Sequence, residues 1–155
     1  MMSRPVPVRL RLVQPTMETL EEDHLIQRIL CSDLEAVADN LPILPSTLEV
    51  RRLCDRIMRV TATHFVRAEQ VFDSLPIGQR PGAATLEMLH AMHQLDELHG
   101  HDLIVALWQH VGRTNGSHVG ELAYMLRCFF DGCRRAIALK ESLMALTQRP
   151  VVMTG

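Results

Sequence analysis

Four polar residues recur at helical spacing in one stretch of the chain: His90, His93, Glu97 and His101. Because each residue of an α-helix advances by about 100°, these positions fall within an arc roughly 80° wide. The same arc and its edge carry apolar side chains, which predicts that this face is buried: Leu86, Leu89, Ile104, Leu107, Trp108 and Val111. Imidazole and carboxylate groups are costly to bury unless something compensates them, and a bound metal ion is the commonest compensation for several of them together. The spacing therefore predicts metal binding.

The composition is that of a helical domain rather than a nucleic-acid-binding or membrane protein. The chain has 155 residues, 47% of them hydrophobic and 4% aromatic, and a formal net charge of −2. This length predicts one domain, and the low aromatic content favours helices over sheets.

The charge gives no basic field for nucleic acid, and no apolar run approaches membrane-spanning length. The N-terminal segment lacks the apolar stretch of a signal peptide. Four cysteines without a C-x-x-C pattern predict free thiols in the cytoplasm.

Helix breakers divide the chain into four long helical stretches that are joined by short connections. These stretches are predicted over about 17–40, 46–74, 83–111 and 117–147, with an extended arm at 1–16 and a tail at 148–155. Ser46 and Glu49 form an S-x-x-E capping pattern, and Ser117 is the expected N-cap of the last helix. Short links between long helices favour antiparallel neighbours, so the predicted fold is an all-α, up-down-up-down four-helix bundle.

Each helix also places an ionisable residue on or beside its apolar stripe. His24 lies at the flank of the first stripe, His64 well inside the second, and Lys140 and Glu141 at the centre and edge of the fourth. One histidine at such a place is usually a hydrogen-bonded core residue, but several from successive helices favour a metal site. Histidine and carboxylate ligands suit iron, manganese or zinc. His99 and His110 are expected to face solvent.

Four segments, in order, resemble the hemerythrin-like (HHE cation-binding) family. They are "EEDHLIQRIL" with His24, "HFVRAE" with His64 and Glu69, "ELHGHDLIVAL" with Glu97 and His101, and "RRAIALKESL" with Ile137 and Glu141. The resemblance covers about 17–147. It implies a four-helix bundle with a non-haem, usually di-iron, centre, and it places His101 at the main ligand position of the third helix.

The sequence departs from the family pattern where ligands are expected. Ala68 and Ala136 replace a carboxylate and a histidine, Lys140 replaces a carboxylate, and Glu69 lies about 100° from the stripe centre. The complete di-iron set is therefore absent. The predicted ligands are His24, His64, Glu97 and His101, with Glu141 as a fifth. His90 and His93 either replace missing ligands and restore a second metal, or hydrogen-bond the ligands from outside.

These observations leave three classes of function open. The first is a mononuclear or dinuclear iron domain that senses or stores iron, oxygen or nitric oxide, with manganese or zinc as other metals. The second is a bundle that has lost its metal, contains a buried Lys140–Glu97 ion pair, and binds a protein partner. The third is a redox enzyme handling peroxide, nitric oxide or ferrous iron, for which no substrate pocket can be identified in the sequence.

Overall fold

The computed structural model of the chain describes residues 15–111 and 119–147. Helix α1 is Met17–Asn40, and α2 is Thr47–Arg59. A π-helical turn, η1, follows at Val60–His64 and leads into α3, Phe65–Asp73. The two longest helices are α4, Ala83–Val111, and α5, Val119–Thr147. The predicted arm, most of it before residue 15, the predicted tail and the predicted cap at Ser117 lie outside the described residues.

Local signals account for where the helices begin and end. The Thr16 hydroxyl accepts from the backbone N–H of Thr19, and the Thr19 hydroxyl accepts from the N–H of Thr16, which is a reciprocal cap. Ser46 caps α2 by accepting from the N–H of Glu49 at 3.2 Å. The predicted second helix is continuous from 47 to 73, except that it widens into the π turn at η1.

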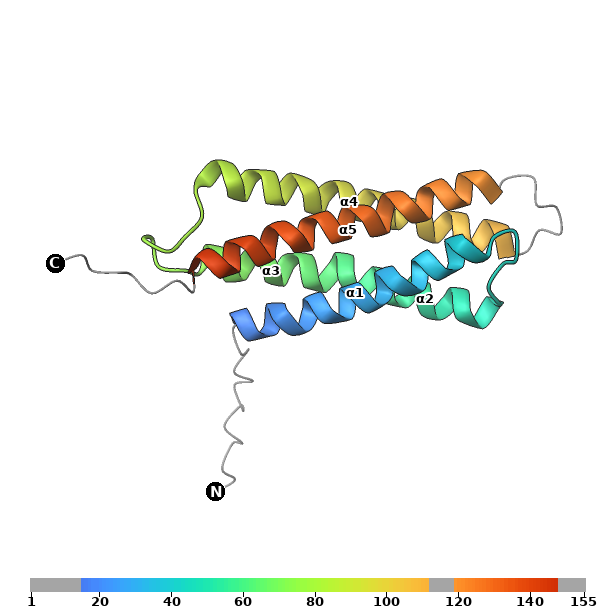
Figure 1. The fold of residues 1–155 in the computed structure, drawn as a ribbon, viewed down its shortest axis with the longest axis horizontal. Coiled ribbons are helices and arrows are strands. Elements are labelled where there is room, and N and C mark those ends of the chain that lie inside the picture. The colour runs from blue at the N-terminus through green and yellow to red at the C-terminus, as the bar shows by residue number, and fades with distance from the viewer. Residues whose placement is uncertain (1–14, 112–118, 148–155) are drawn as a thin grey trace, which may run out of the picture.

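The helices form an antiparallel bundle of four rods in which α2, η1 and α3 together make one rod (Figure 1). The chain runs up α1, back along α2–η1–α3, up α4 and back along α5. No strand occurs within the described residues. The predicted all-α four-helix bundle is confirmed. Within the same residues, no helix is both long enough and apolar enough to cross a membrane.

A layer of buried polar side chains separates two apolar clusters in the bundle interior. On α1, for example, Leu20 belongs to one cluster and Leu30 and Leu34 to the other, with Asp23, His24 and Gln27 buried between them. The other rods contribute buried polar residues to the interior in the same way, namely Thr61, His64, His93, Asp96 and Lys140. This polar layer is where the fold places the residues that could do chemistry.

Two glycines allow the helices to approach closely beside the polar layer. A Cβ added at Gly100 of α4 would lie 3.0 Å from the Phe129 ring and 3.2 Å from Ile57. A Cβ added at Gly132 of α5 would lie 2.2 Å from Oδ1 of Asp96. A Cβ at Gly132 would overlap the Asp96 carboxylate, and one at Gly100 would require its neighbours to shift by a few tenths of an ångström, so both glycines mark close contacts between helices.

The predicted buried face of α4 is wrong by about one residue of helical rotation. Leu89, His93 and Leu107 of the predicted face are buried, and its members Leu86, Ile104 and Val111 are partly buried against the apolar clusters. Asp96, Gly100 and Leu103, which were not predicted there, are buried instead of the remaining members. His90, Glu97, His101 and Trp108 are all exposed. Apolar residues are spread around much of α4, so its pattern did not determine the rotation. The close contact of Gly100 with Phe129 and Ile57 determined the rotation of α4.

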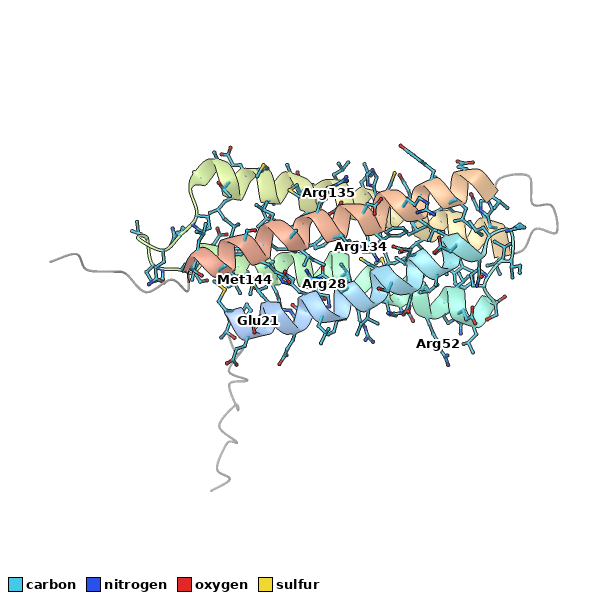
Figure 2. The ribbon with its side chains drawn as sticks, in the orientation of Figure 1. Glu21, Arg28, Arg52, Arg134, Arg135 and Met144 are labelled. Carbon is cyan, nitrogen blue, oxygen red and sulfur yellow. The ribbon has the colours of Figure 1, made fainter. Side chains whose placement is uncertain are left out.

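Three ion pairs run along the boundary between α1 and α5, where Arg28 and Arg134 are visible (Figure 2). The pairs join Arg28 to Glu141, Glu35 to Arg134 and Asp39 to Arg127. We call this set the α1–α5 ladder. Surface ion pairs each contribute at most about 1 kcal/mol to stability, so the apolar clusters carry most of the free energy of folding.

Candidate metal centre

The structure brings three of the seven predicted ligands into the polar layer. The side chains of His24, His64 and His93 are buried, each from a different rod. His90, Glu97 and His101 lie on the exposed side of α4, and Glu141 is 42% exposed at the rim, where it pairs with Arg28. The predicted Lys140–Glu97 ion pair is therefore wrong. His110, expected at the surface, is buried, and its Nδ1 lies 2.7 Å from the carbonyl oxygen of Ala106.

Lys140 provides the cation at the middle of this layer. Its side chain is fully buried, as the sequence predicted, and its Nζ lies 3.0 Å from Nε2 of His93. Nζ also lies 5.5 Å from the centroid of the Phe65 ring, within reach of a cation–π interaction. Burial lowers the pKa of Lys140 from 10.5 to about 8, although neighbouring acidic groups, among them Asp96 and Asp23, favour its charged form. The ammonium is therefore still the major form at pH 7.

His93 links this buried cation to the surface. Its ring stacks on Phe65 at 4.4 Å, and burial followed by the Lys140 charge lowers its pKa to about 3. A neutral imidazole that accepts from Lys140 at Nε2 carries its own proton on Nδ1. That Nδ1 lies 3.8 Å from Oε1 of Glu69, and the same carboxylate pairs with exposed His90. Polar groups thus lie in sequence between Lys140 and solvent, but His93 Nδ1 makes no hydrogen bond to any described residue.

His24 has no hydrogen-bond partner among the described residues at either ring nitrogen. Its Nδ1 lies 3.7 Å from Oε1 of Glu141, which is already held by Arg28. Burial lowers the pKa of His24 to about 4, and the Lys140 charge acts in the same direction. The ring is therefore neutral at pH 7, and it presents an unused lone pair to the interior.

Asp23 and His64 form a second polar contact in the same layer. Oδ1 of Asp23 lies 2.8 Å from Nδ1 of His64 and 2.8 Å from Nη2 of Arg67. Arg67 donates to the carboxylate, so this buried charge is paired with an arginine whose side chain is 35% exposed. His64 is thereby held at the end of the π turn. Such turns occur frequently at functional sites.

Asp23, Gln27 and Asp96 are buried polar residues that the sequence analysis did not identify. Burial raises the pKa of Asp96 to about 6, even though Lys140 lowers it. The signal that could have found Asp96 is the glycine pattern. Gly100 lies one helical turn after Asp96, and Gly132 leaves the space that the Asp96 carboxylate fills. Small residues at close helix contacts thus mark the inward face more reliably than the scattered apolar residues of α4.

The architecture and its buried histidines and carboxylates define a four-helix bundle of the kind that holds ions in its core. The family model described as the hemerythrin HHE cation-binding domain matches residues 16–145, and this chain belongs to that family. The predicted resemblance is confirmed. No match was found among curated proteins or solved structures.

The residues in the polar layer do not fit the metal centre that the family implies. Within residues 15–111 and 119–147, no three His, Cys, Asp or Glu side chains converge closely enough to hold a metal ion. Ala68 and Ala136 are buried and provide no ligand atom, and the Lys140 ammonium would repel a metal cation beside His93. Unpartnered atoms remain on His24, Asp23 and Asp96, but they face a layer that already contains a cation.

Proposed function

We propose that this chain is a metal-independent member of the hemerythrin HHE family, in which the Lys140 ammonium takes the place of a bound metal cation. On this proposal the bundle serves as a protein-interaction module rather than as an oxygen carrier or a redox enzyme. The observation that carries the proposal is the position of Lys140. It is fully buried and bonded to His93, in the layer where three helical rods each contribute a histidine.

Charge balance supports this assignment. The Asp23 and Asp96 side chains are buried near Lys140, and the charges of both favour its protonated form. Removing one partner of such a set is costly, because it leaves an uncompensated charge in the interior. The charge of a covalently attached ammonium balances part of the negative charge of these carboxylates at longer range without any metal, which accounts for a buried lysine in a cation-binding fold.

The unpartnered nitrogens of His24 favour a second candidate, a mononuclear site that forms when Lys140 moves aside. Iron is the metal predicted from the sequence for such a site, with manganese or zinc as alternatives, and oxygen or nitric oxide as its ligand. This candidate requires His24 and His93 to lie within bonding distance of one ion. The ligand roles of the exposed His90, Glu97 and His101 and of rim residue Glu141 stay predictions.

Metal titration distinguishes the two candidates. Purified protein is incubated anaerobically with Fe(II), and separately with Mn(II) or Zn(II), then desalted and measured by elemental analysis and thermal unfolding. We expect less than about 0.1 metal per chain and an unchanged melting temperature, since a ligand stabilises only the state that binds it. The variant Lys140→Glu, which introduces a carboxylate in place of the ammonium, is expected to retain metal.

Retention of about one metal per wild-type chain, together with a higher melting temperature, would overturn the proposal and support the mononuclear site. The control is Arg52→Glu on the exposed surface of α2, which makes the same change of charge outside the polar layer. If Arg52→Glu gained metal as Lys140→Glu does, the gain would reflect net charge and not the position of Lys140.

A further inference from the structure

A cavity of about 250 Å³ lies between α1 and the α2–η1–α3 rod, and His64 of the polar layer forms part of its lining. We call it the α1–η1 groove. Ile26 and Leu30 of α1 and Val60 of η1 form its apolar wall. The volume corresponds to about eight water molecules at liquid density, so the groove suits a small molecule rather than a folded partner.

The polar side of the groove is cationic and has no carboxylate in its lining. Arg56, Arg59 and Arg67 line it together with Thr63 and His64. Two larger cavities on the same bundle both contain acidic residues in their lining. One is lined by Asp33 and Glu49 as well as by arginines, and another by Glu69, Asp73 and Glu87. The absence of Asp and Glu from the lining of the α1–η1 groove favours a negatively charged ligand.

The net charge of the groove indicates how much negative charge the ligand carries. Arg56 pairs with Asp33 at 2.7 Å, and Arg67 pairs with Asp23 at 2.8 Å. Arg59 is exposed and forms no ion pair with any described residue. Two of the three positive charges are therefore already balanced, and about one remains. That balance matches a monoanion better than a dianion.

One donor of a lining residue is unused. The Nε atom of Arg67 is buried and lacks a hydrogen-bond partner among the described residues. Arg59, Thr63 and Arg67 all line the groove, so two guanidinium groups and a hydroxyl border the same cavity. Guanidinium groups bind planar carboxylates through two parallel hydrogen bonds.

We propose that the α1–η1 groove binds a small aliphatic carboxylate, whose charged end contacts Arg59, Arg67 and Thr63 and whose tail contacts Ile26, Leu30 and Val60. The proposal does not require a metal in the polar layer, because the unbalanced charge is that of Arg59 and the tail contacts the apolar wall. Arg67 and His64 are the residues that the groove shares with the polar layer.

The test is a titration of the full-length protein with sodium butyrate, followed by the backbone amide shifts of residues 56–67 in NMR spectra at constant ionic strength. We expect saturable shifts in the millimolar range that are confined to the groove. Butyramide, the neutral analogue, is expected to bind at least about tenfold more weakly. Inorganic phosphate is expected to bind more weakly than butyrate, because the groove has about one free positive charge.

Matched arginine variants locate the site. Arg59→Ala is expected to weaken butyrate binding at least about tenfold, whereas Arg51→Ala, at another exposed arginine of the same rod, is expected to leave it unchanged. Both positions are exposed, so both variants are expected to fold, and thermal unfolding checks this. No saturable shift with wild type, equal binding to Arg59→Ala, or equal binding of butyramide would overturn the proposal. Tighter binding of phosphate would overturn the ligand class.

Discussion

Burial of neutral histidines makes the stability of this protein depend on pH. The unfolded chain protonates His24 and His93 as the pH falls through their ordinary value of 6.5. The folded protein keeps both rings neutral down to a pKa of about 4 for His24 and about 3 for His93. The unfolded state therefore binds more protons in this interval, and the free energy of unfolding falls as the pH falls.

Asp96 stabilises the folded protein as the pH falls, and this partly offsets the loss in free energy of unfolding caused by the two histidines. Its folded pKa is about 6 against an ordinary 3.8, so the folded state binds the extra proton between these values. Two histidines each destabilise by about 2 kcal/mol at pH 5, and Asp96 offsets about 1.4 kcal/mol of this. We predict that the free energy of unfolding drops by about 2 kcal/mol between pH 7 and pH 5, measured by urea denaturation at each pH.

The matched variant is His24→Leu, which removes one of the two titrating rings. Its loss of stability between pH 7 and pH 5 should be smaller than that of wild type by about 2 kcal/mol. An unchanged pH dependence in this variant would mean that His24 is protonated in the folded protein, and the neutral ring described for the polar layer would then be incorrect. His99→Leu on the same bundle controls for loss of a histidine as such.

Among the elements, α4 and α5 are positioned by small residues at their contact. We predict that Gly132→Ala lowers the free energy of unfolding by about 1–3 kcal/mol, because its Cβ would meet the Asp96 carboxylate at 2.2 Å. Gly120→Ala on the same helix has nothing within 4 Å of the added carbon. It should be neutral or stabilising by up to about 1 kcal/mol, since alanine is the better helix former. If Gly132→Ala were as neutral or stabilising as Gly120→Ala, the contact with Asp96 would not constrain this position.

The outer face of α4 carries a stripe of exposed apolar residues that suits pairing with another helix. Met88 and Leu95 are seven residues apart, as are Leu98 and Val105, and each of these side chains is at least half exposed. The four residues are separated by seven, three and seven positions, which corresponds to part of the seven-residue apolar repeat by which two helices pack, with Ala91 and Asp102 at the intervening positions. An antiparallel pair related by a twofold axis would bring Leu95 of one copy next to Leu98 of the other.

We therefore predict that the protein self-associates through α4. Analytical ultracentrifugation should detect a concentration-dependent dimer, and Leu98→Glu should weaken it at least about tenfold by placing a charge in the apolar contact. Ile77→Glu introduces the same charge at an apolar residue that is 86% exposed and lies outside the helices, and it should leave the dimer intact. A wild-type protein that stays monomeric at high concentration would contradict this use of the stripe.

The sequence predicted where the helices begin and end better than it predicted which face of each helix is buried. Breakers and caps gave the ranges 17–40 and 83–111, which match α1 and α4. The rotation of α4 was not predictable from its apolar residues. For that reason the predicted interior positions of Glu97 and His101 were wrong. The buried positions of His24, His64 and Lys140 were predicted correctly, because their own helices have clearer apolar stripes.

For the whole molecule, the order of helices and their short connections were enough to predict an antiparallel bundle, and the family match agrees with that prediction. What could not be predicted is the set of contacts between elements. Asp96 beside Gly132 and His93 beside Lys140 each join residues from different helices, so no pattern within one helix contains them.

The α1–α5 ladder also specifies how these two helices are aligned along their length. Arg28 and Glu35 of α1 are seven residues apart and opposite in charge, as are Arg134 and Glu141 of α5. If α1 slid by seven residues along α5, either Glu35 would face Glu141 or Arg28 would face Arg134. A misaligned bundle therefore places like charges opposite each other, so the ladder selects one alignment even though it adds little to stability.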